Sequence, residues 1–406
     1  MSTLNETPRG ERTHIAFFGR RNAGKSSLVN ALAGQPVAIV SPVKGTTTDP
    51  VYKSMELLPL GPVELIDTPG LDDEGDLGGL RVQRTREVLE RTDIAVVVTD
   101  ASQSCCDAER ELLATLREKA IPFVWVRNKI DLGTAEEPHP IEGGKSIDVS
   151  AVSGEGVDAL RRLLASMVPE TGAERTILQD LIKPNEVVVL VTPIDSAAPK
   201  GRLILPQQET LRDVLDRGAV AVVAREAELR EALRRLSEPP ALVVTDSQAF
   251  AVVSQIVPRE IPLTSFSILF ARYKGDLDEL VRGANKMRHL QEGDRILIAE
   301  GCTHLRKKED IGTVKIPKLL QKKTGKTFRF TTVSGMGYPP DLSEYALVIH
   351  CGGCMLNRRE VCHRIRLATE AGVAITNYGV ALAELNGILH RCLEALREVP
   401  GERGSK

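Results

Sequence analysis

Short apolar segments alternate with segments of helical spacing along residues 13–170. Four of the segments are almost wholly apolar, as strands of a parallel sheet that is covered on both faces usually are. They lie at residues 14–18, 63–66, 94–99 and 123–126. The first leads into a glycine-rich turn, and residues 26–33 after that turn have the spacing of a helix. This alternation predicts a mostly parallel α/β domain.

The same alternation returns in residues 186–266, where no glycine-rich fingerprint accompanies it. Strands are predicted at residues 187–191, 219–223 and 241–244, and helices at residues 210–217 and 226–236. No pattern in this part carries chemistry of its own, and the loop at residues 195–202 is its one unusual segment. Because function has to be argued from a site, we interpret this part as a packing or dimerisation module.

Residues from 267 onward open with a helical pattern, which predicts one long helix over residues 268–290. Apolar runs at residues 295–299 and 345–349 predict two further strands. The chain is therefore expected to form three α/β domains with mainly parallel sheets. Their predicted bounds are residues 1–172, 173–266 and 267–406.

Composition and charge narrow the classes of function. The 406 residues include 53 basic and 55 acidic ones, so the chain lacks the basic footprint of most nucleic-acid binders. One basic stretch, at residues 306–329, has nine Lys and Arg, and we interpret it as a solvated helix face. The N-terminus lacks the apolar core of a signal peptide, and no apolar run is long enough to span a bilayer. We expect a cytoplasmic protein with neither a membrane nor nucleic acid as its partner.

Residues 19–26, with the sequence GRRNAGKS, match the phosphate loop of nucleoside triphosphatases. Backbone N–H groups of such a loop converge on the β-phosphate at the start of a helix, where the helix dipole adds about half a positive charge. Lys25 is predicted to bridge the β- and γ-phosphates, and the Ser26 hydroxyl to bind Mg²⁺.

Three further motifs follow in the order that a GTP-binding protein requires. In DTPG at residues 67–70, the Asp67 carboxylate is placed to hold Mg²⁺ and the Gly70 N–H group to meet the γ-phosphate. NKID at residues 128–131 supplies Asp131, which can accept from two guanine N–H groups that adenine does not offer. Ser150 and Ala151, a short SA segment, then close over the base. The predicted GTP-binding residues are Asn22, Ala23, Gly24, Lys25, Ser26, Ser27, Asp67, Gly70, Asn128, Lys129, Asp131, Ser150 and Ala151.

Over residues 13–170 these motifs resemble the TRAFAC-class GTPases, especially the Era and MnmE branch. The residue after DTPG is Leu71, where Ras-like enzymes place the glutamine that orients the attacking water. An apolar side chain cannot do this. The resemblance implies that a K⁺ ion supplies positive charge between the phosphates, held partly by an asparagine of the phosphate loop. Asn22 occupies the matching position.

The switch segment at residues 44–49, KGTTTD, resembles the GTTRD sequence of the same branch. The resemblance implies that Thr47 is a Mg²⁺ ligand, with Thr46 or Thr48 as alternatives after a shift of one residue. The predicted catalytic residues are Lys25, Thr47 and Gly70. We expect a K⁺-stimulated GTPase with Mg²⁺ as its second metal and GDP as its bound product.

Seven cysteines in a chain without a secretion signal do not indicate a disulfide framework. Three of them, Cys302, Cys351 and Cys354, follow predicted strands of the last domain. Ligand sites in open α/β sheets lie beyond the carboxyl ends of the strands, so these cysteines are expected to converge. Together with His304 and His350 they fit a tetrahedral zinc site as well as an iron–sulfur cluster. Cys362 and Cys392 lie in helical patterns and are interpreted as buried thiols.

The GTPase motifs, joined to CTH at residues 302–304 and HCGGC at residues 350–354, resemble the HydF family of FeFe-hydrogenase maturation GTPases along the whole chain. The resemblance implies a 4Fe–4S cluster on the three cysteines, which leaves one iron with an exchangeable ligand. His304, Glu309 and His350 are the candidates for that fourth contact or for residues that support the ligands. His350 should point away from Cys351 on its strand, which favours the supporting role.

The same resemblance implies a function and partners. The protein would assemble and carry a transient di-iron precursor of the hydrogenase active site, and deliver it to the apo FeFe-hydrogenase. Its partners would be the radical-SAM maturases HydE and HydG and further copies of itself, as a homodimer or a larger assembly. The alternative is an RNA-associated GTPase, like its Era and MnmE relatives, with a structural zinc. The basic stretch at residues 306–329 is the support for that alternative.

Overall fold

The computed structural model describes residues 7–35, 50–71, 85, 87–134, 144–167, 176–178, 180–193, 203–301, 310–335 and 337–397. Contacts within the chain divide it into two compact units, Met1–Glu170 and Thr171–Lys406. Among the helices in the described ranges, none has the length and apolar character that crossing a lipid bilayer requires.

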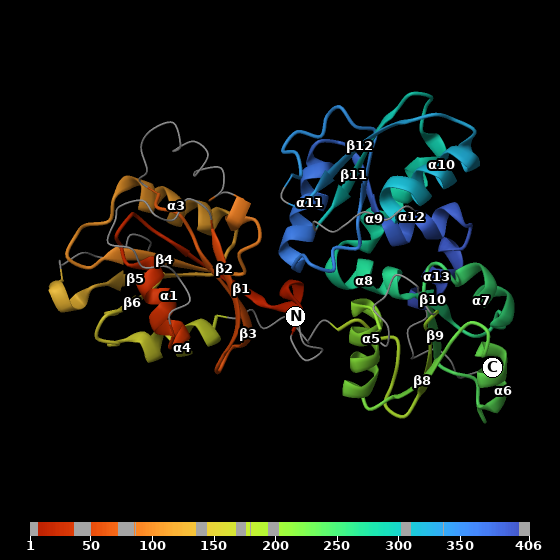
Figure 1. Ribbon diagram of the computed structural model, residues 1–406, viewed down its shortest axis with the longest axis horizontal. Helices are drawn as coiled ribbons and strands as arrows, with labels where there is room; N and C mark the ends of the chain where they lie inside the picture. Colours follow the sequence, from red (N-terminus) through yellow and green to blue (C-terminus); the bar gives the residue numbers. More distant parts are fainter. Residues whose placement is uncertain are drawn as a thin grey trace. The chain divides into compact units, whose positions relative to one another are not determined.

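The first unit contains a six-stranded sheet in the order β2-β3-β1-β4-β5-β6 (Figure 1). Its strands are β1 (Thr13–Phe18), β2 (Val51–Leu57), β3 (Gly61–Asp67), β4 (Ile94–Asp100), β5 (Phe123–Asn128) and β6 (Lys145–Asp148). Its helices include α1 (Lys25–Ala33), α3 (Asp107–Glu118) and α4 (Val157–Ala165), with short 3₁₀ turns at Arg9–Glu11 and Ile130–Leu132. Only β2 runs antiparallel to its neighbour among the described strands. The predicted mostly parallel α/β domain is confirmed.

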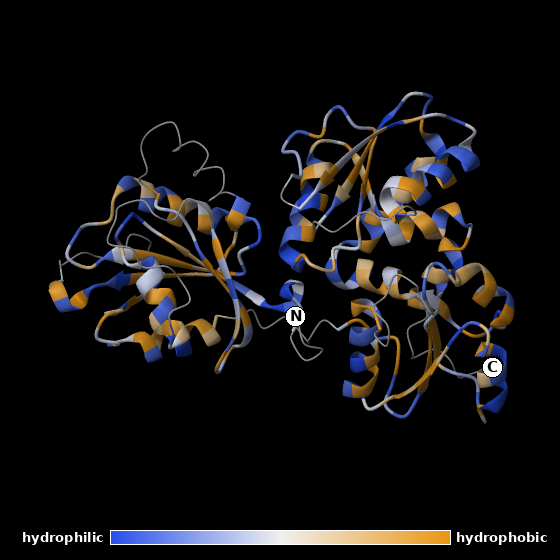
Figure 2. Cartoon of the chain, viewed as in Figure 1, coloured by the Kyte–Doolittle hydropathy of each residue, from blue (hydrophilic) through white to orange (hydrophobic). Residues whose placement is uncertain are grey.

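Both faces of this sheet are buried, which explains why its strands are almost wholly apolar. On β1, Ile15 and Phe17 face the core that contains side chains of α1 and α4. Ala16 and Phe18, between and after them, face the core on the side of α3. In Figure 2 the central strands of this sheet are mainly hydrophobic, while the helices beside it mix hydrophobic and hydrophilic residues. The sheet is thus fixed from both sides, and loops at the carboxyl ends of its strands can hold a ligand.

The second unit contains two four-stranded sheets, and every strand pair described in them is parallel. The first sheet, ordered β10-β9-β7-β8, has the strands β7 (Val187–Val191), β8 (Val220–Ala224), β9 (Leu242–Thr245) and β10 (Leu263–Ser265). The second sheet, ordered β12-β11-β13-β14, has the strands β11 (Arg295–Glu300), β12 (Arg329–Ser334), β13 (Leu347–His350) and β14 (Ala374–Asn377). The prediction of two further α/β domains with mainly parallel sheets is confirmed.

Helices cover both sheets of this unit. They are α5 (Leu205–Asp216), α6 (Leu229–Arg235), α7 (Phe250–Ile256), α8 (Phe266–Lys274), α9 (Leu277–Lys286), α10 (Ile316–Thr324), α11 (Arg358–Glu370), α12 (Tyr378–Leu385) and α13 (Leu389–Arg397). A 3₁₀ turn at Met287–His289 follows α9, and a π-helical turn at Ile311–Lys315 leads into α10.

One apolar core serves both sheets of the second unit. It contains Val189 and Val243 from the first sheet together with Ile296 and Ile349 from the second. Helix α8 lies between the sheets (Figure 1) and contacts α5 on one side and α12 on the other. The two sheets therefore pack as one body. The domain boundary predicted between residues 266 and 267 falls at the start of α8 and stays a prediction.

The single helix predicted over residues 268–290 is wrong. Helix α8 ends at Lys274, and α9 begins at Leu277. Gly275 between them is extended, and the Asp276 carboxylate accepts a hydrogen bond from the Glu279 N–H at 3.0 Å. Gly275 ends the first helix, and Asp276 caps the start of the second. The prediction missed this break because the apolar spacing continues across it.

Candidate nucleotide and metal sites

The glycine loop leaves β1 and enters α1 without room for side chains at its two ends. Gly19 has a φ of 146°, and a Cβ on it would lie 2.0 Å from the Val98 carbonyl oxygen. Gly24 has a φ of 93°, and a Cβ there would lie 2.2 Å from Nδ2 of Asn128. These close approaches fix the backbone of the loop at the start of α1, as the predicted phosphate site requires.

Lys25, Ser26 and Asp67 are brought together next to the glycine loop. The buried Lys25 ammonium donates to the carbonyl oxygens of Gly19 and Arg20, each at 2.8 Å. The Ser26 hydroxyl donates to Oδ2 of Asp67 at 2.5 Å, while Oδ1 of Asp67 is buried without a hydrogen-bond partner. Burial raises the pKa of Asp67, and the bond from Ser26 and the charge of Lys25 oppose that rise. A buried orphan oxygen beside a hydroxyl fits a Mg²⁺ ion, which would satisfy both.

The predicted base-binding residues meet at the ends of β5 and β6. Asn128 is buried; its amide donates to the Ala23 carbonyl oxygen at 2.9 Å and accepts from the Ala151 N–H at 3.0 Å. This side chain joins the phosphate loop to the SA segment. The Ser150 hydroxyl donates to Oδ1 of Asp131 at 2.5 Å, which orients the carboxylate that is predicted to recognise guanine.

Lys129, in the middle of this motif, has a φ of 68° and pairs with Asp100 at 2.8 Å. Burial opposes ionisation of Asp100, but hydrogen bonds from Lys129 and Ser102 outweigh it and lower its pKa. The pair ties the end of β5 to the end of β4. It also helps to hold Lys129 in the left-handed backbone conformation, which residues other than glycine rarely adopt.

The switch residues are only partly within the described residues. Thr47, with its alternatives Thr46 and Thr48, lies outside them. The Leu71 N–H, next to Gly70, donates to the Gly19 carbonyl oxygen at 3.3 Å, so the DTPG segment lies against the glycine loop. Asn22 is exposed and has a φ of 60°.

Arg20 is a residue of the phosphate loop that sequence reasoning missed. Its guanidinium pairs with Glu109 of α3 at 3.0 Å and donates to the Ser104 carbonyl oxygen at 3.2 Å. Glu109 is fully buried and also accepts from the Cys106 N–H. The partners are 89 positions apart, so no local pattern signals the pair.

At the other end of the chain, Cys351 directly follows β13. Its sulfur accepts hydrogen bonds from the Gly301 N–H at 3.0 Å and from the Gly353 N–H at 3.4 Å. Gly353 has a φ of 67°, a left-handed conformation that turns the backbone between Cys351 and Cys354. Burial raises the pKa of both thiols, and the two N–H groups oppose this at Cys351. Two backbone donors aimed at one sulfur are an arrangement that stabilises a thiolate, the form that binds metal.

Gly301 is the last described residue before the segment that carries Cys302. Cys302, His304 and Glu309 lie outside the described residues. Within the described ranges, no three His, Cys, Asp or Glu side chains gather as a metal site would need. The two cysteines of the HCGGC motif fit part of a cluster-binding set by their chemistry: both are soft donors on one glycine-rich turn.

His350 is buried and both of its ring nitrogens are engaged. Nδ1 lies 2.7 Å from the Cys351 carbonyl oxygen and must donate to it, and Nε2 lies 3.0 Å from a guanidinium N–H of Arg364, from which it must accept. Burial, aided by the charge of Arg364, lowers the pKa of His350 to about 4. A neutral ring held in this way positions the Cys351 backbone.

Two buried cations near the cysteine turn were missed by sequence reasoning. Arg364 pairs with Glu360 at 2.8 Å and donates to the Gly335 carbonyl oxygen at 2.9 Å. Lys274, at the end of α8, donates to the carbonyl oxygens of Leu356 and Cys354. Each side chain is 2% exposed, which is rare for a charged residue.

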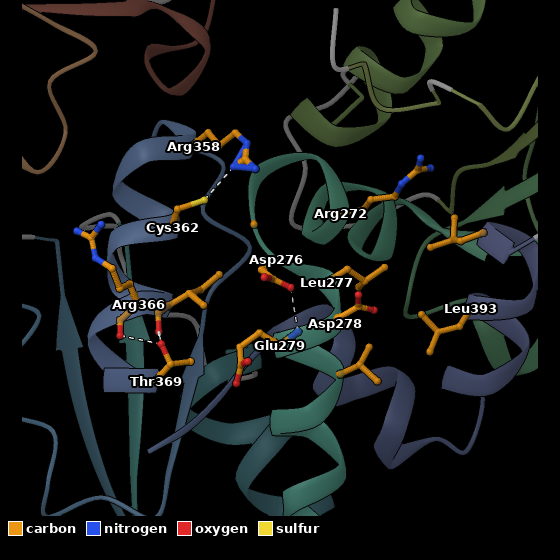
Figure 3. Close-up of a pocket in the computed structure, with 14 residues that line it drawn as sticks. Arg272, Asp276, Leu277, Asp278, Glu279, Arg358, Cys362, Arg366, Thr369 and Leu393 are labelled. Atoms are coloured by element: carbon orange, nitrogen blue, oxygen red, sulfur yellow. Dashed lines mark hydrogen bonds between the residues drawn. The ribbon is translucent and has the colours of Figure 1, made fainter. Parts of the chain in front are cut away.

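Cys362 is half-buried, where the sequence predicted a buried thiol, because it lines a cavity of about 720 Å³ between α11 and the turn from α8 to α9. A guanidinium N–H of Arg358 donates to its sulfur at 2.9 Å, as Figure 3 shows. The thiol in turn donates to the Lys274 carbonyl oxygen at 3.7 Å. Cys392 is buried, as predicted.

Three family models match the chain. Residues 14–129 match the 50S ribosome-binding GTPase model, residues 177–275 the hydrogen maturase F dimerization domain, and residues 278–395 the hydrogen maturase F tetramerization domain. The glycine loop, the DTPG segment and the guanine motif thus belong to a P-loop GTPase domain, followed by two α/β domains that serve self-association in other proteins of their kind.

These last two models together cover more than half of the chain. The chain therefore belongs to the hydrogen maturase F family and has the domain composition of a HydF-type hydrogenase maturation GTPase.

The curated relatives that match part of this chain include tRNA modification GTPases. A tRNA modification GTPase MnmE from Laribacter hongkongensis is 39% identical over 164 residues, which cover 39% of this chain and 35% of that protein. The MnmE of Koribacter versatilis is 34% identical over 207 residues, 49% of this chain and 44% of that protein. The chain thus spans less than half the length of these relatives. A crystal structure of an Aquifex aeolicus Era variant bound to GDP and aluminium fluoride shares 22% identity at a TM-score of 0.36, covering 55% of this chain and 98% of that one.

Proposed function

We propose that this protein is a GTP-hydrolysing iron–sulfur scaffold that assembles the di-iron precursor of the FeFe-hydrogenase active site and delivers it to the apo-hydrogenase. The observation that carries the proposal is the hydrogen bond from the Gly301 N–H to the Cys351 sulfur. Strands β11 and β13 are parallel neighbours, so their carboxyl ends lie side by side. The residue after Gly301 is Cys302, which supports a site shared by Cys302, Cys351 and Cys354.

Such a site would hold a 4Fe–4S cluster on three thiolates. Three protein ligands leave one iron open to an exchangeable ligand, which a carrier needs for loading and release. Among the candidates for the fourth contact, His350 has both ring nitrogens engaged within the protein. It would therefore support the ligands and not bind the cluster itself. Glu309 and His304 stay as the candidates for direct contact.

Anaerobic purification with spectroscopy tests the cluster. Wild type should be brown, with about four iron and four sulfide per chain. Cys302→Ser, Cys351→Ser and Cys354→Ser should each lose most of the iron, whereas Cys392→Ser, a buried thiol in α13, should keep it. A colourless wild type that contains zinc would instead support an RNA-associated GTPase with a structural metal.

GTP is proposed to bind at the glycine loop with Mg²⁺ on Ser26 and Asp67, and its hydrolysis to be stimulated by K⁺. Leu71 has no group that can orient water, and Asn22 is exposed at the loop, where it can reach a cation beside the phosphates. The GTPase rate should therefore be higher in potassium than in sodium buffer, and Asn22→Ala should remove the difference. Equal rates of wild type in the two buffers would contradict the proposal.

GTP is proposed to act as a switch for partner binding, since a ligand shifts an equilibrium only by its different affinities for two states. Affinity for the radical-SAM maturases HydE and HydG should then change between GTP and GDP. Identical affinities with GTP, with GDP and without nucleotide, measured by calorimetry, would rule the switch out.

Self-association is proposed to use the edge of the first sheet of the second unit. Strand β8 ends the described sheet, and its Val220 and Val223 are 50% and 45% exposed. An exposed apolar edge strand is a template for pairing with another chain. Val223→Lys should shift the protein toward monomer in sedimentation, whereas Lys53→Ala on β2 should not.

A further inference from the structure

Lys274 lies at the end of α8 with its ammonium group inside the protein. Its Nζ lies 3.1 Å from the Leu356 carbonyl oxygen and 3.4 Å from that of Cys354. Both acceptors belong to the turn that starts at the second cysteine of the motif. The Lys274 side chain therefore contacts the backbone of the cysteine turn from the side of α8.

The main chain of Lys274 is held as firmly as its side chain. Its carbonyl oxygen accepts from the Cys362 thiol of α11, and that thiol accepts from Arg358 (Figure 3). Gly275, directly after it, allows α8 to stop there. Lys274 is thus held at its main chain by α11 and at its ammonium group by the cysteine turn.

A buried ammonium group costs free energy unless hydrogen bonds or opposite charges compensate for it. A neutral donor would cap two carbonyl oxygens at a smaller desolvation cost. A full charge is favoured where negative charge gathers, as it does on deprotonated cysteines. The Lys274 ammonium group lies against the backbone of the turn that starts at Cys354, one of the two described cysteines of the motif. The position of the cation therefore matches the charge that a thiolate-bound iron centre would bring.

We propose that Lys274 is a positioning residue for the iron–sulfur cluster, which fixes the turn that carries Cys354 and compensates the negative charge of the bound centre. The inference rests on the proposed scaffold function. A fixed positive charge stabilises the reduced cluster, which carries one more electron, over the oxidised one. Lys274 therefore raises the reduction potential of the cluster, and it acts through the field and the backbone without being a ligand.

Redox titration of the full chain, purified anaerobically and followed by electron paramagnetic resonance, tests this. Lys274→Gln keeps an N–H donor and removes the charge, and Lys274→Arg keeps the charge. We expect Lys274→Gln to lower the midpoint potential by about 59 mV or more, a tenfold change for one electron. Lys274→Arg should stay close to wild type. Lys286→Gln, which removes an exposed lysine from the end of α9, is the matched control and should cause no shift.

The outcomes separate the inference from the function on which it rests. If metal analysis finds no iron or sulfide in the wild type, both the scaffold function and the role of Lys274 are overturned. A wild type with a cluster whose potential does not change in Lys274→Gln overturns the role of Lys274 and leaves the scaffold function standing. If Lys274→Gln fails to hold iron, Lys274→Arg decides: recovery of iron and of the wild-type potential supports the inference, and failure to recover them overturns it.

Discussion

The nucleotide site and the cysteine turn both lie where parallel strands end, but different residues hold them in place. In the nucleotide site the motif residues bind one another: Lys25 bonds to the glycine loop, Ser26 to Asp67. The cysteine turn has bonds within its motif too, but its two buried cations come from outside the motif, Lys274 from α8 and Arg364 from α11. In the first site the cations belong to the motifs themselves, whereas in the second they are supplied by the fold around the motif.

The largest effect is expected from removing a support of the cysteine turn. Arg364→Met removes the ion pair with the buried Glu360, so the free energy of unfolding of the second unit should fall by about 3–5 kcal/mol. Urea denaturation of the metal-free protein measures this. Arg366→Met, an exposed arginine two positions further along α11, should cost less than about 0.5 kcal/mol. Equal effects of the two changes would contradict the dependence on buried supports.

A change within the nucleotide motif should stay within the nucleotide site. Lys25→Ala should lower kcat for GTP by roughly 10²–10³-fold, about 2.7–4 kcal/mol, because the charge that meets the phosphates is lost. The iron content of the same preparation should not change. Lys53→Ala, an exposed lysine of β2, is the control for both measurements. Loss of iron in Lys25→Ala would show that metal binding depends on the nucleotide site.

Acid should weaken both units in the same pH range, because each has a buried histidine. Burial is the main reason that the pKa values of His14 and His350 are lowered from 6.5 to about 4. The unfolded chain binds these protons first, so the stability contribution is complete above pH 6.5 and is lost as the pH falls toward 4. Each histidine should account for about 1.4 kcal/mol per pH unit, roughly 3 kcal/mol in all.

Single variants assign the two contributions. His350→Gln should flatten the acid dependence of unfolding in the second unit alone, and His14→Gln that of the first unit alone. Calorimetric scans between pH 7 and pH 4 follow both transitions. Unchanged slopes in either variant would mean that other groups control the acid response.

The smallest effect is expected at the thiol that lines the cavity. Cys362→Ala removes the contact with Arg358 and the bond to the Lys274 carbonyl oxygen, which should cost about 1 kcal/mol of unfolding free energy. A loss above about 3 kcal/mol would place Cys362 among the main supports of the cysteine turn.

The same contrast explains what could be predicted from the sequence. Local motifs predicted the glycine loop, the guanine motif and the strands before them, because their chemistry is contained in a few neighbouring residues. The supports of the cysteine turn were not predictable, since Lys274 and Leu356 are 82 positions apart. The turn at Gly275 and Asp276 was missed because its apolar flanks keep one helical period on both sides. Cys302, His304, Glu309 and Thr47 lie outside the described residues and stay predictions.

The core shared by the two sheets of the second unit has a mechanical consequence. A hinge between the sheets would have to open the apolar contacts that Val189 and Ile349 make within one cluster. A relative movement of the two sheets would therefore expose apolar side chains to water. The cysteine turn after β13 stands on this shared core, since Ile349, two residues before Cys351, belongs to it.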